Sequence, residues 1–192
     1  MRDYMPSAGV FVTVRFAYFY RSEKRFNRSI WMDKVKVLFV CLGNICRSPL
    51  AEAIFKTRML QHGMDSMVEA DSCGTAGYHI GDSPDPRTIA NAKRNGIEIK
   101  HVGRQLTQHD LEHYDFILAM DRSNFSNILN IRGAESHRKK ISLLRTFDSA
   151  RNDDEVPDPY YGDELAFQQV FEIADNAVNS FISYLKSTHL KV

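Results

Sequence analysis

Cysteine is scarce in this sequence, with three in 192 residues. A secreted scaffold held together by disulfides normally has more cysteines, and an even number of them, so this class is disfavoured. A low, odd count fits a reducing, cytoplasmic compartment and one working thiol better. An excess of charge of one sign is also lacking, because 25 Lys and Arg balance 24 Asp and Glu to a net charge of +1. This balance gives no support for a nucleic-acid partner.

Long hydrophobic runs are absent as well. A membrane span needs about eighteen consecutive apolar residues, and the most apolar stretch, 10–20, is too short and too interrupted. No internal repeat is visible. With 43% hydrophobic residues, the chain is long enough to bury the core of one domain.

The most informative segment joins a short apolar strand to a helix through a polar loop. Residues 35–40 are mostly β-branched or aromatic, which is typical of a strand covered on both faces. Ser48 as the N-cap and Pro49 as the first helical residue predict a helix over 49–61. A strand–loop–helix turn directs free backbone N–H groups and a helix N-terminus to one point, which makes an anion site.

The residue types in this loop fit an anion site that carries a nucleophile. Gly43 and Asn44 tolerate the left-handed backbone that such a loop needs. The surrounding field favours the thiolate form of Cys41 at the base of the loop. Arg47 offers a planar fork to two phosphate oxygens. Alone, Cys41 could be a small buried hydrophobe, but the combination predicts attack of a thiolate on a phosphate ester.

Other uses of this loop fail on spacing. A nucleotide-binding Walker loop needs Gly-Lys-Ser/Thr after four spacer residues, and this pattern is missing. Cys41 and Cys46 are five residues apart, which fits neither a thioredoxin pair nor a typical zinc half-site.

From about residue 34 to 190 the sequence resembles the low-molecular-weight protein-tyrosine phosphatases. The Cys-x5-Arg signature lies at 41–49, and a second signature, Asp-Pro-Tyr-Tyr-Gly, lies at 158–162. Further matches follow in order at 71–75, 81–87, His101 and Met120-Asp121. The resemblance implies an α/β fold, a three-layer, doubly wound, four-stranded parallel sheet in the order 2-1-3-4. Helices would cover both faces, and the phosphate-binding loop would follow the first strand.

The resemblance also implies three catalytic roles in a protein-tyrosine phosphatase. Cys41 would attack phosphorus and form a phosphocysteine intermediate, while Arg47 would hold the phosphate oxygens. Asp158 would protonate the departing phenolate and later take a proton from water. The substrates would be phosphotyrosine-bearing proteins and small aryl phosphates. No metal or cofactor is expected, because Arg47 and the loop amides supply the charge stabilisation.

Residues around these three are expected to bind the substrate or to support the loop. The substrate-binding set comprises Leu42, Gly43, Asn44, Ile45, Cys46, Tyr78, Tyr160 and Tyr161. Ser48 is expected to donate to the thiolate besides capping the helix, and Ser72 and His101 are expected to hold Asn44. Asp121 would orient Arg47 or cap the following helix. For His101 alone, a core or solvent-facing histidine is the alternative.

Cys46 points to redox regulation, since it shares a tight loop with Cys41. A reversible Cys41–Cys46 disulfide would protect the nucleophile from irreversible oxidation. The alternative is that Cys46 only packs beneath the loop.

Three other functions were weighed against phosphotyrosine hydrolysis. Arsenate reductases of this fold use additional downstream cysteines, whereas this chain has only Cys73 besides the loop pair. Protein-arginine phosphatases resemble this loop but carry Thr where this chain has Ile45. A non-catalytic phosphate-binding module is disfavoured by the complete set of Cys, Arg and Asp. A monomer or weak homo-oligomer is expected.

Strands and helices are predicted to alternate along the chain. Strands are expected at 35–40, 67–72, 114–120 and 140–144, and helices at 49–61, 86–95, 122–130 and 163–186. This alternation predicts a parallel sheet with the site at the carboxyl ends of its strands. Residues 34–192 would form the catalytic domain. Residues 1–33 are interpreted as an N-terminal extension, poorly ordered or upstream of a true start near Met32, with a functional arm or a targeting segment as alternatives.

Overall fold

The computed structural model describes residues 33–149 and 152–190, so the predicted extension lies almost wholly outside the described residues. Four strands form one parallel sheet in the order β2-β1-β3-β4, which confirms the predicted fold class. Their bounds are β1 (Val35–Cys41), β2 (Val68–Gly74), β3 (Phe116–Ala119) and β4 (Ile141–Leu143). A strand was expected at or near each of these positions.

The register of the sheet brings the chain segments of the site together. Cys41, the last residue of β1, pairs with Gly74 of β2, and Val40 pairs with Ala119 of β3. The carboxyl ends of the three strands therefore meet at one edge. This is the edge at which parallel α/β sheets bind their ligands.

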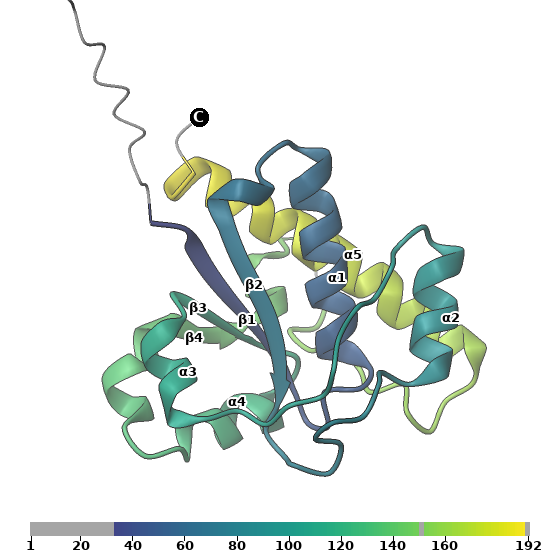
Figure 1. Cartoon of the computed structure of the whole chain (residues 1–192), viewed down its shortest axis with the longest axis horizontal. Helices are drawn as coiled ribbons and strands as arrows, with labels where there is room; N and C mark the ends of the chain where they lie inside the picture. The colour runs from purple at the N-terminus through teal and green to yellow at the C-terminus, as the bar shows by residue number, and fades with distance from the viewer. Residues whose placement is uncertain (1–32, 150–151, 191–192) are drawn as a thin grey trace, which may run out of the picture. The chain divides into compact units, whose positions relative to one another are not determined.

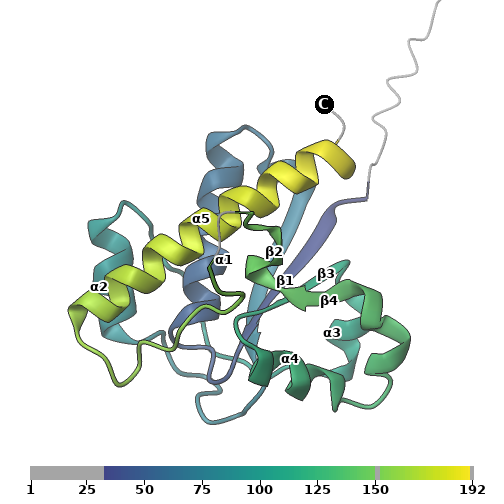
Figure 2. The same cartoon turned by 180° about the vertical axis from the view of Figure 1, so that it is seen from behind.

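Helices cover both faces of the sheet (Figures 1 and 2). The helices α1 (Arg47–Gln61) and α5 (Glu164–Thr188) pack on one face, with α2 (Pro86–Arg94) beside α5. The shorter helices α3 (Gln108–His113) and α4 (Arg122–Leu129) lie on the other. The sheet is thus the middle of three layers.

The central strand explains why both faces need cover. Along β1, Val37 and Phe39 pack into the core formed with α1 and α5, whereas Leu38 and Val40 pack into the core formed with α3 and α4. All four side chains are completely buried. An apolar run without polar alternation is the sequence consequence of this double burial.

The helix after the loop begins earlier than predicted. It starts at Arg47, with Cys46 as N-cap and no side-chain cap, so the prediction of Ser48 as N-cap was wrong. The Ser48 hydroxyl instead lies within hydrogen-bond distance of Cys41, Asn44 and Cys73. The helix α3 was not predicted, because six residues are too few to show a helical period.

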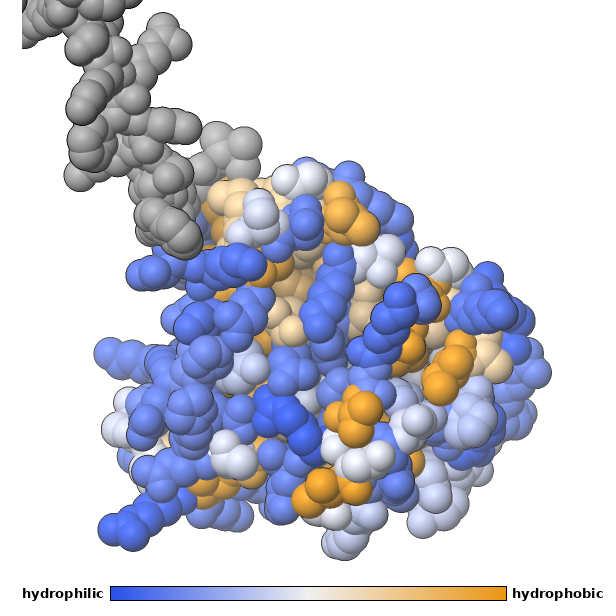
Figure 3. Space-filling model, viewed as in Figure 1, coloured by the Kyte–Doolittle hydropathy of each residue, from blue (hydrophilic) through white to orange (hydrophobic). Residues whose placement is uncertain are grey.

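The surface seen in Figure 3 is mostly hydrophilic, with apolar side chains gathered in separate small patches. Among the described helices, none combines the length and the apolar character required to cross a bilayer.

Candidate active site

The loop after β1 turns on Asn44, which has φ of 58° and is the only non-glycine residue with positive φ in the described ranges. Its Nδ2 donates to Ser48 Oγ at 2.9 Å and to Ser72 Oγ at 3.0 Å. Its Oδ1 accepts from the backbone N–H of Arg104 at 2.9 Å and lies 2.7 Å from Nε2 of His101. These contacts offset the steric cost of a left-handed asparagine, about 1 kcal/mol.

Cys41 lies at the end of β1 beneath this turn and is 3% exposed. The backbone N–H of Asn44 donates to Sγ at 3.2 Å, and the Ser48 hydroxyl lies 3.0 Å from Sγ. Ser48 Oγ accepts from Asn44 Nδ2, and its one hydrogen can be donated either to the sulfur or to the carbonyl of Cys73 at 3.3 Å. Two donors can therefore stabilise a thiolate at this position.

The backbone of the loop presents further donors above the sulfur. Within the described residues, the N–H groups of Gly43, Ile45, Cys46 and Arg47 have no protein acceptor. They precede or open α1, whose N-terminus favours negative charge. Unpaired amides at a helix N-terminus suit the predicted anion site.

Arg47 is buried, and its guanidinium bridges two other segments of the site. Nη1 donates to Asp121 Oδ2 at 2.6 Å and to the carbonyl of Val156 at 3.2 Å, while Nη2 donates to Asp158 Oδ2 at 2.7 Å. Burial lowers the pKa of Arg47, but the neighbouring sulfur of Cys41 and the carboxylates of Asp158 and Asp121 raise it above its ordinary value. The guanidinium is therefore a fixed positive charge.

Asp158 lies opposite the loop, between two prolines that restrict its backbone. Its Oδ1 accepts from the backbone N–H of Tyr160 at 3.2 Å, while Oδ2 holds Arg47. The side chain is 45% exposed, so a proton can reach it from solvent. Its place beside the pocket and its contact with Arg47 suit a proton donor to a bound ligand.

These groups share one pocket of about 290 Å³. Its lining residues are Cys41, Leu42, Gly43, Ile45, Cys46, Arg47, Tyr78, His79, Asp158, Tyr160 and Tyr161. Of the predicted catalytic and substrate-binding residues, all but Asn44 line it. Asn44 holds the loop from beneath instead. Tyr78 and Tyr161 are 77% and 97% exposed, and they form the outer rim.

His79 was not expected at this pocket. Its ring covers Gly43 so closely that a Cβ at Gly43 would lie 3.1 Å from His79 Cδ2. The ring is held by Asp82 through Nδ1 at 3.0 Å. The only sequence signal for His79 was its position directly after Tyr78, an aromatic residue that was expected at the pocket.

The four residues predicted to support the loop all lie beside it. Ser48 and Ser72 hold the Asn44 amide, and His101 lies against its Oδ1. Asp121 takes both of its alternative roles: Oδ2 binds Arg47, and Oδ1 caps α4 by accepting from the backbone N–H of Asn124 at 2.6 Å.

Glu52 is a supporting residue that sequence analysis missed. It is 3% exposed on α1, accepts from Ser72 Oγ at 2.7 Å, and lies 3.2 Å from Nδ1 of His101. Burial raises the pKa of Glu52, but hydrogen bonds from His101, Lys56 and Ser72 outweigh it and hold the pKa below its ordinary value of 4.5. Its position four residues after Ser48, on the same helix face, was the available signal.

The three cysteines are all free thiols and are buried. Burial, the largest influence, raises the pKa of Cys46 to about 12 and the pKa of Cys73 well above its ordinary value. Both are therefore held as neutral thiols near neutral pH.

One group of potential metal ligands occurs in the described part of the chain: Glu52, Asp71 and His101. Each already has a protein partner. Ser72 donates to Glu52, Arg104 donates to Asp71 at 2.8 Å, and His101 lies against Asn44. Their arrangement is explained by support of the loop without an ion.

Comparisons with known proteins agree with this site. A family model described as low molecular weight phosphotyrosine protein phosphatase matches residues 36–191. Relatives of that name in Schizosaccharomyces pombe and Homo sapiens are 41% and 40% identical, covering 80% and 76% of this chain and 96% and 92% of theirs.

Solved structures extend the comparison. A protein tyrosine phosphatase from Entamoeba histolytica, with Hepes in the active site, has a TM-score of 0.77 and 38% identity over 80% of this chain and 98% of that one. An arginine phosphatase from drosophila also matches, with a TM-score of 0.73 and 30% identity over 80% of this chain and 99% of that one.

We predict that Glu52→Gln destabilises the fold by about 1–3 kcal/mol near neutral pH, because it weakens charge-assisted hydrogen bonds in a buried network. The folded-state pKa of Glu52 is lowered, so its contribution is present above the unfolded pKa and is lost as pH falls through the folded value. The difference between wild type and variant should therefore shrink below about pH 4.5.

Urea unfolding of both proteins at a series of pH values measures this difference. Glu98→Gln is the matched control, because Glu98 is 76% exposed and pairs with Lys100 at the surface. A difference that stays constant from neutral to acid pH would contradict the assigned role.

Proposed function

This chain belongs to the low molecular weight phosphotyrosine protein phosphatase family, and on that premise we propose that it hydrolyses phosphotyrosine through a phosphocysteine on Cys41. One observation carries the proposal. A single pocket contains the Cys41 sulfur and the Arg47 guanidinium, from the loop after β1, and the Asp158 carboxyl, from a segment more than a hundred residues later.

Substrate binding starts with an exchange of partners at Arg47. Its Nη1 stays on Asp121 and the Val156 carbonyl, which fix the plane of the guanidinium. Its Nη2, now on Asp158, turns to a phosphate oxygen, and the unpaired loop amides bind the others. Asp158, released from Nη2, is then free to act on the leaving group.

The first chemical step transfers the phosphoryl group to sulfur. The Cys41 thiolate forms an S–P bond in line with the P–O bond that breaks, and Asp158 gives its proton to the phenolate oxygen. Arg47 and the amides stabilise the charge on the phosphoryl oxygens. In the second step water attacks phosphorus, Asp158 takes its proton, and the S–P bond breaks to restore the Cys41 thiolate.

The pocket walls support an aryl phosphate as the substrate class. Tyr78, Tyr160 and Tyr161 line the entrance, and the rings of Tyr160 and Tyr161 meet edge-to-face with centroids 5.0 Å apart. A flat phosphoaryl group buries more surface against such rings than a phosphoserine does. Phosphotyrosine-bearing proteins are therefore the proposed partners.

Arginine phosphatase activity is the second candidate, since a solved arginine phosphatase shares the fold at 30% identity. Two features favour phosphotyrosine. Ile45 lines the pocket at the position where the sequence comparison above expects Thr in an arginine phosphatase. The acid loop also contributes Tyr160 and Tyr161 to the pocket wall.

The proposal extends to the organisation of the chain. Residues 34–192 are proposed as the catalytic domain and 1–33 as an extension, in line with the family match over 36–191. We propose a reducing, cytoplasmic compartment, because Cys41 must be reduced to act and all three cysteines are free thiols. A monomer or weak homo-oligomer is proposed.

Replacing the nucleophile tests the proposal directly. Cys41→Ser is expected to lower kcat for phosphotyrosine peptides by about 10⁴-fold or more, because a neutral hydroxyl replaces the thiolate while Arg47 and the amides still bind phosphate. Steady-state kinetics and phosphate-binding calorimetry measure the two effects. Cys73→Ala, which removes a thiol outside the pocket, should retain activity. Normal turnover by Cys41→Ser would refute the assignment.

A substrate panel separates the two candidate activities. Peptides bearing phosphotyrosine, phosphoarginine or phosphoserine are compared by kcat/KM, with arsenate reduction as a further control. We expect phosphotyrosine to exceed each of the others by at least about tenfold, which corresponds to 1.4 kcal/mol of transition-state binding. A preference for phosphoarginine would replace the proposed substrate class.

Redox control by Cys46 is also proposed. Peroxide would oxidise the Cys41 thiolate to sulfenic acid, and the Cys46 thiol would displace water to form a disulfide, which an added thiol reduces. Both cysteines lie on one loop and line the same pocket. In Cys46→Ala we expect peroxide inactivation to become largely irreversible, measured as activity regained with dithiothreitol. Recovery equal to that of wild type would exclude this protection.

A further inference from the structure

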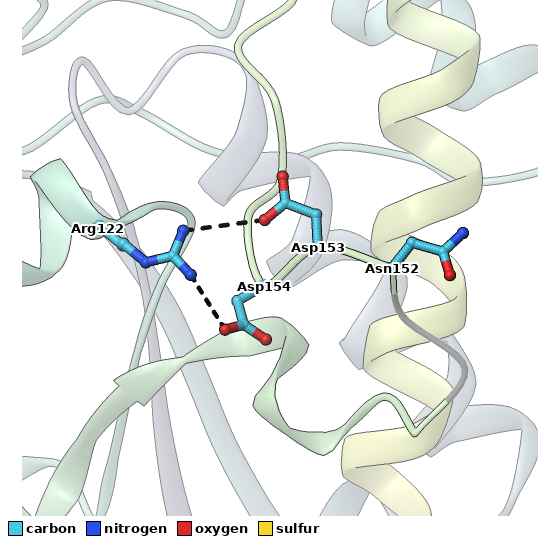
Figure 4. Close-up of a pocket in the computed structure, with 4 residues that line it drawn as sticks. All are labelled: Arg122, Asn152, Asp153 and Asp154. Carbon is cyan, nitrogen blue, oxygen red and sulfur yellow. Dashed lines mark hydrogen bonds and ion pairs between the residues drawn. The ribbon is translucent and has the colours of Figure 1, made fainter.

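Arg122, the first residue of α4, faces three consecutive acidic residues that precede the acid loop. Its Nη2 lies 3.2 Å from Asp154 Oδ2, and its Nη1 lies 3.3 Å from Glu155 Oε1 and 3.9 Å from Asp153 Oδ1. Its backbone N–H also donates to Glu155 Oε1 at 2.8 Å. Figure 4 shows the guanidinium directed at Asp153 and Asp154 from across a groove, while the side chain of Asn152 points away.

The segment that Arg122 contacts leads directly to the proposed acid. We call residues 153–155 the acidic stem. Immediately after it, the N–H of Val156 donates to the carbonyl of Met120 at 2.7 Å, and the carbonyl of Val156 accepts from Arg47. Pro157 then restricts the backbone before Asp158. The stem is therefore joined to Asp158 through two residues, Val156, which is bonded to Met120 and Arg47, and Pro157.

Arg122 itself also lies next to a residue of the site. Arg122 follows Asp121, which caps α4 and binds Arg47. The junction of β3 and α4 thus holds the phosphate-binding arginine through Asp121 and the stem of the acid loop through Arg122. Arg145 also contacts this segment, since its Nη1 donates to the carbonyl of Glu155 at 2.9 Å.

The charges give this contact a consequence beyond stability. An exposed ion pair contributes only about 0–1 kcal/mol, and Arg122 is 62% exposed. However, three adjacent carboxylates repel one another, and within the described ranges Arg122 lies within 4 Å of all three. Without it, repulsion favours a stem that moves away from α4, which strains the bonds of Val156 to Met120 and Arg47 and so disturbs the position of Asp158.

We propose that Arg122 is a positioning residue for catalysis, which holds the acidic stem against α4 and so keeps Asp158 in place to protonate the leaving group. The proposal rests on the proposed role of Asp158 as acid. It concerns proton transfer to the leaving group and leaves the Cys41 attack and the phosphate-binding loop unaltered.

The test compares two aryl phosphates that differ in their need for an acid. Phenyl phosphate has a poor leaving group and para-nitrophenyl phosphate a good one. For Arg122→Met we expect kcat/KM to fall roughly three- to tenfold with phenyl phosphate and less than about twofold with para-nitrophenyl phosphate. Arg122→Lys, which keeps the charge, should restore most of the loss. Arg94→Met, which breaks an exposed pair with Glu164, is the matched control and should leave both values unchanged.

A double variant separates positioning from general destabilisation. In an Asp158→Asn background no acid remains to be positioned, so adding Arg122→Met should cause no further loss. Equal losses with both substrates, a further loss in that background, or no loss at all would each overturn the proposal. If Asp158→Asn alone leaves the ratio of the two kcat/KM values unchanged, the acid assignment fails, and the Arg122 proposal fails with it.

The effect of salt concentration on the wild-type protein gives a further test, which does not depend on the folding of any variant. Because the contact is exposed, added salt screens it, and the ratio of kcat/KM for phenyl phosphate to that for para-nitrophenyl phosphate should fall in wild type. Both substrates carry the same phosphate group, so the effect of salt on phosphate binding cancels in the ratio. A wild-type ratio that does not change with salt would count against Arg122.

Discussion

The left-handed turn at Asn44 is the constraint on which the rest of the site depends. Free N–H groups can converge on one anion only if the backbone reverses sharply between β1 and α1. The reversal is held by an amide side chain that contacts α1 through Ser48, β2 through Ser72, and the later loop through His101 and Arg104. The loop after β1 is therefore held by three other parts of the fold.

The buried network behind Asn44 explains why polar side chains are tolerated in this core. Glu52, Ser72 and His101 are partnered with one another or with the loop, so burial leaves little hydrogen-bonding capacity unsatisfied. A half-satisfied network would cost more than an apolar core. The same network gives the loop a rigid base.

Arg47 joins this loop to the acid loop. Its guanidinium binds Asp121 at the β3–α4 junction, the Val156 carbonyl and Asp158, so one cation links the loop of Cys41 to two other segments that line the site. The Arg122 contact extends the same arrangement outward, from buried to exposed residues.

The sequence by itself determined the strand order and the candidate acid Asp158 through family resemblance, the first and third strands from apolar runs, and Cys41 and Arg47 from residue type and spacing. It could not determine the start of α1, because the Ser48 hydroxyl has several competing partners and only the folded chain selects Cys41 and Asn44 over the helix cap. Glu52, His79 and Arg122 were likewise beyond its reach. A glutamate, a histidine or an arginine acquires its role from neighbours distant in sequence, and only the packing of β2, α1 and α4 brings those neighbours within hydrogen-bond distance.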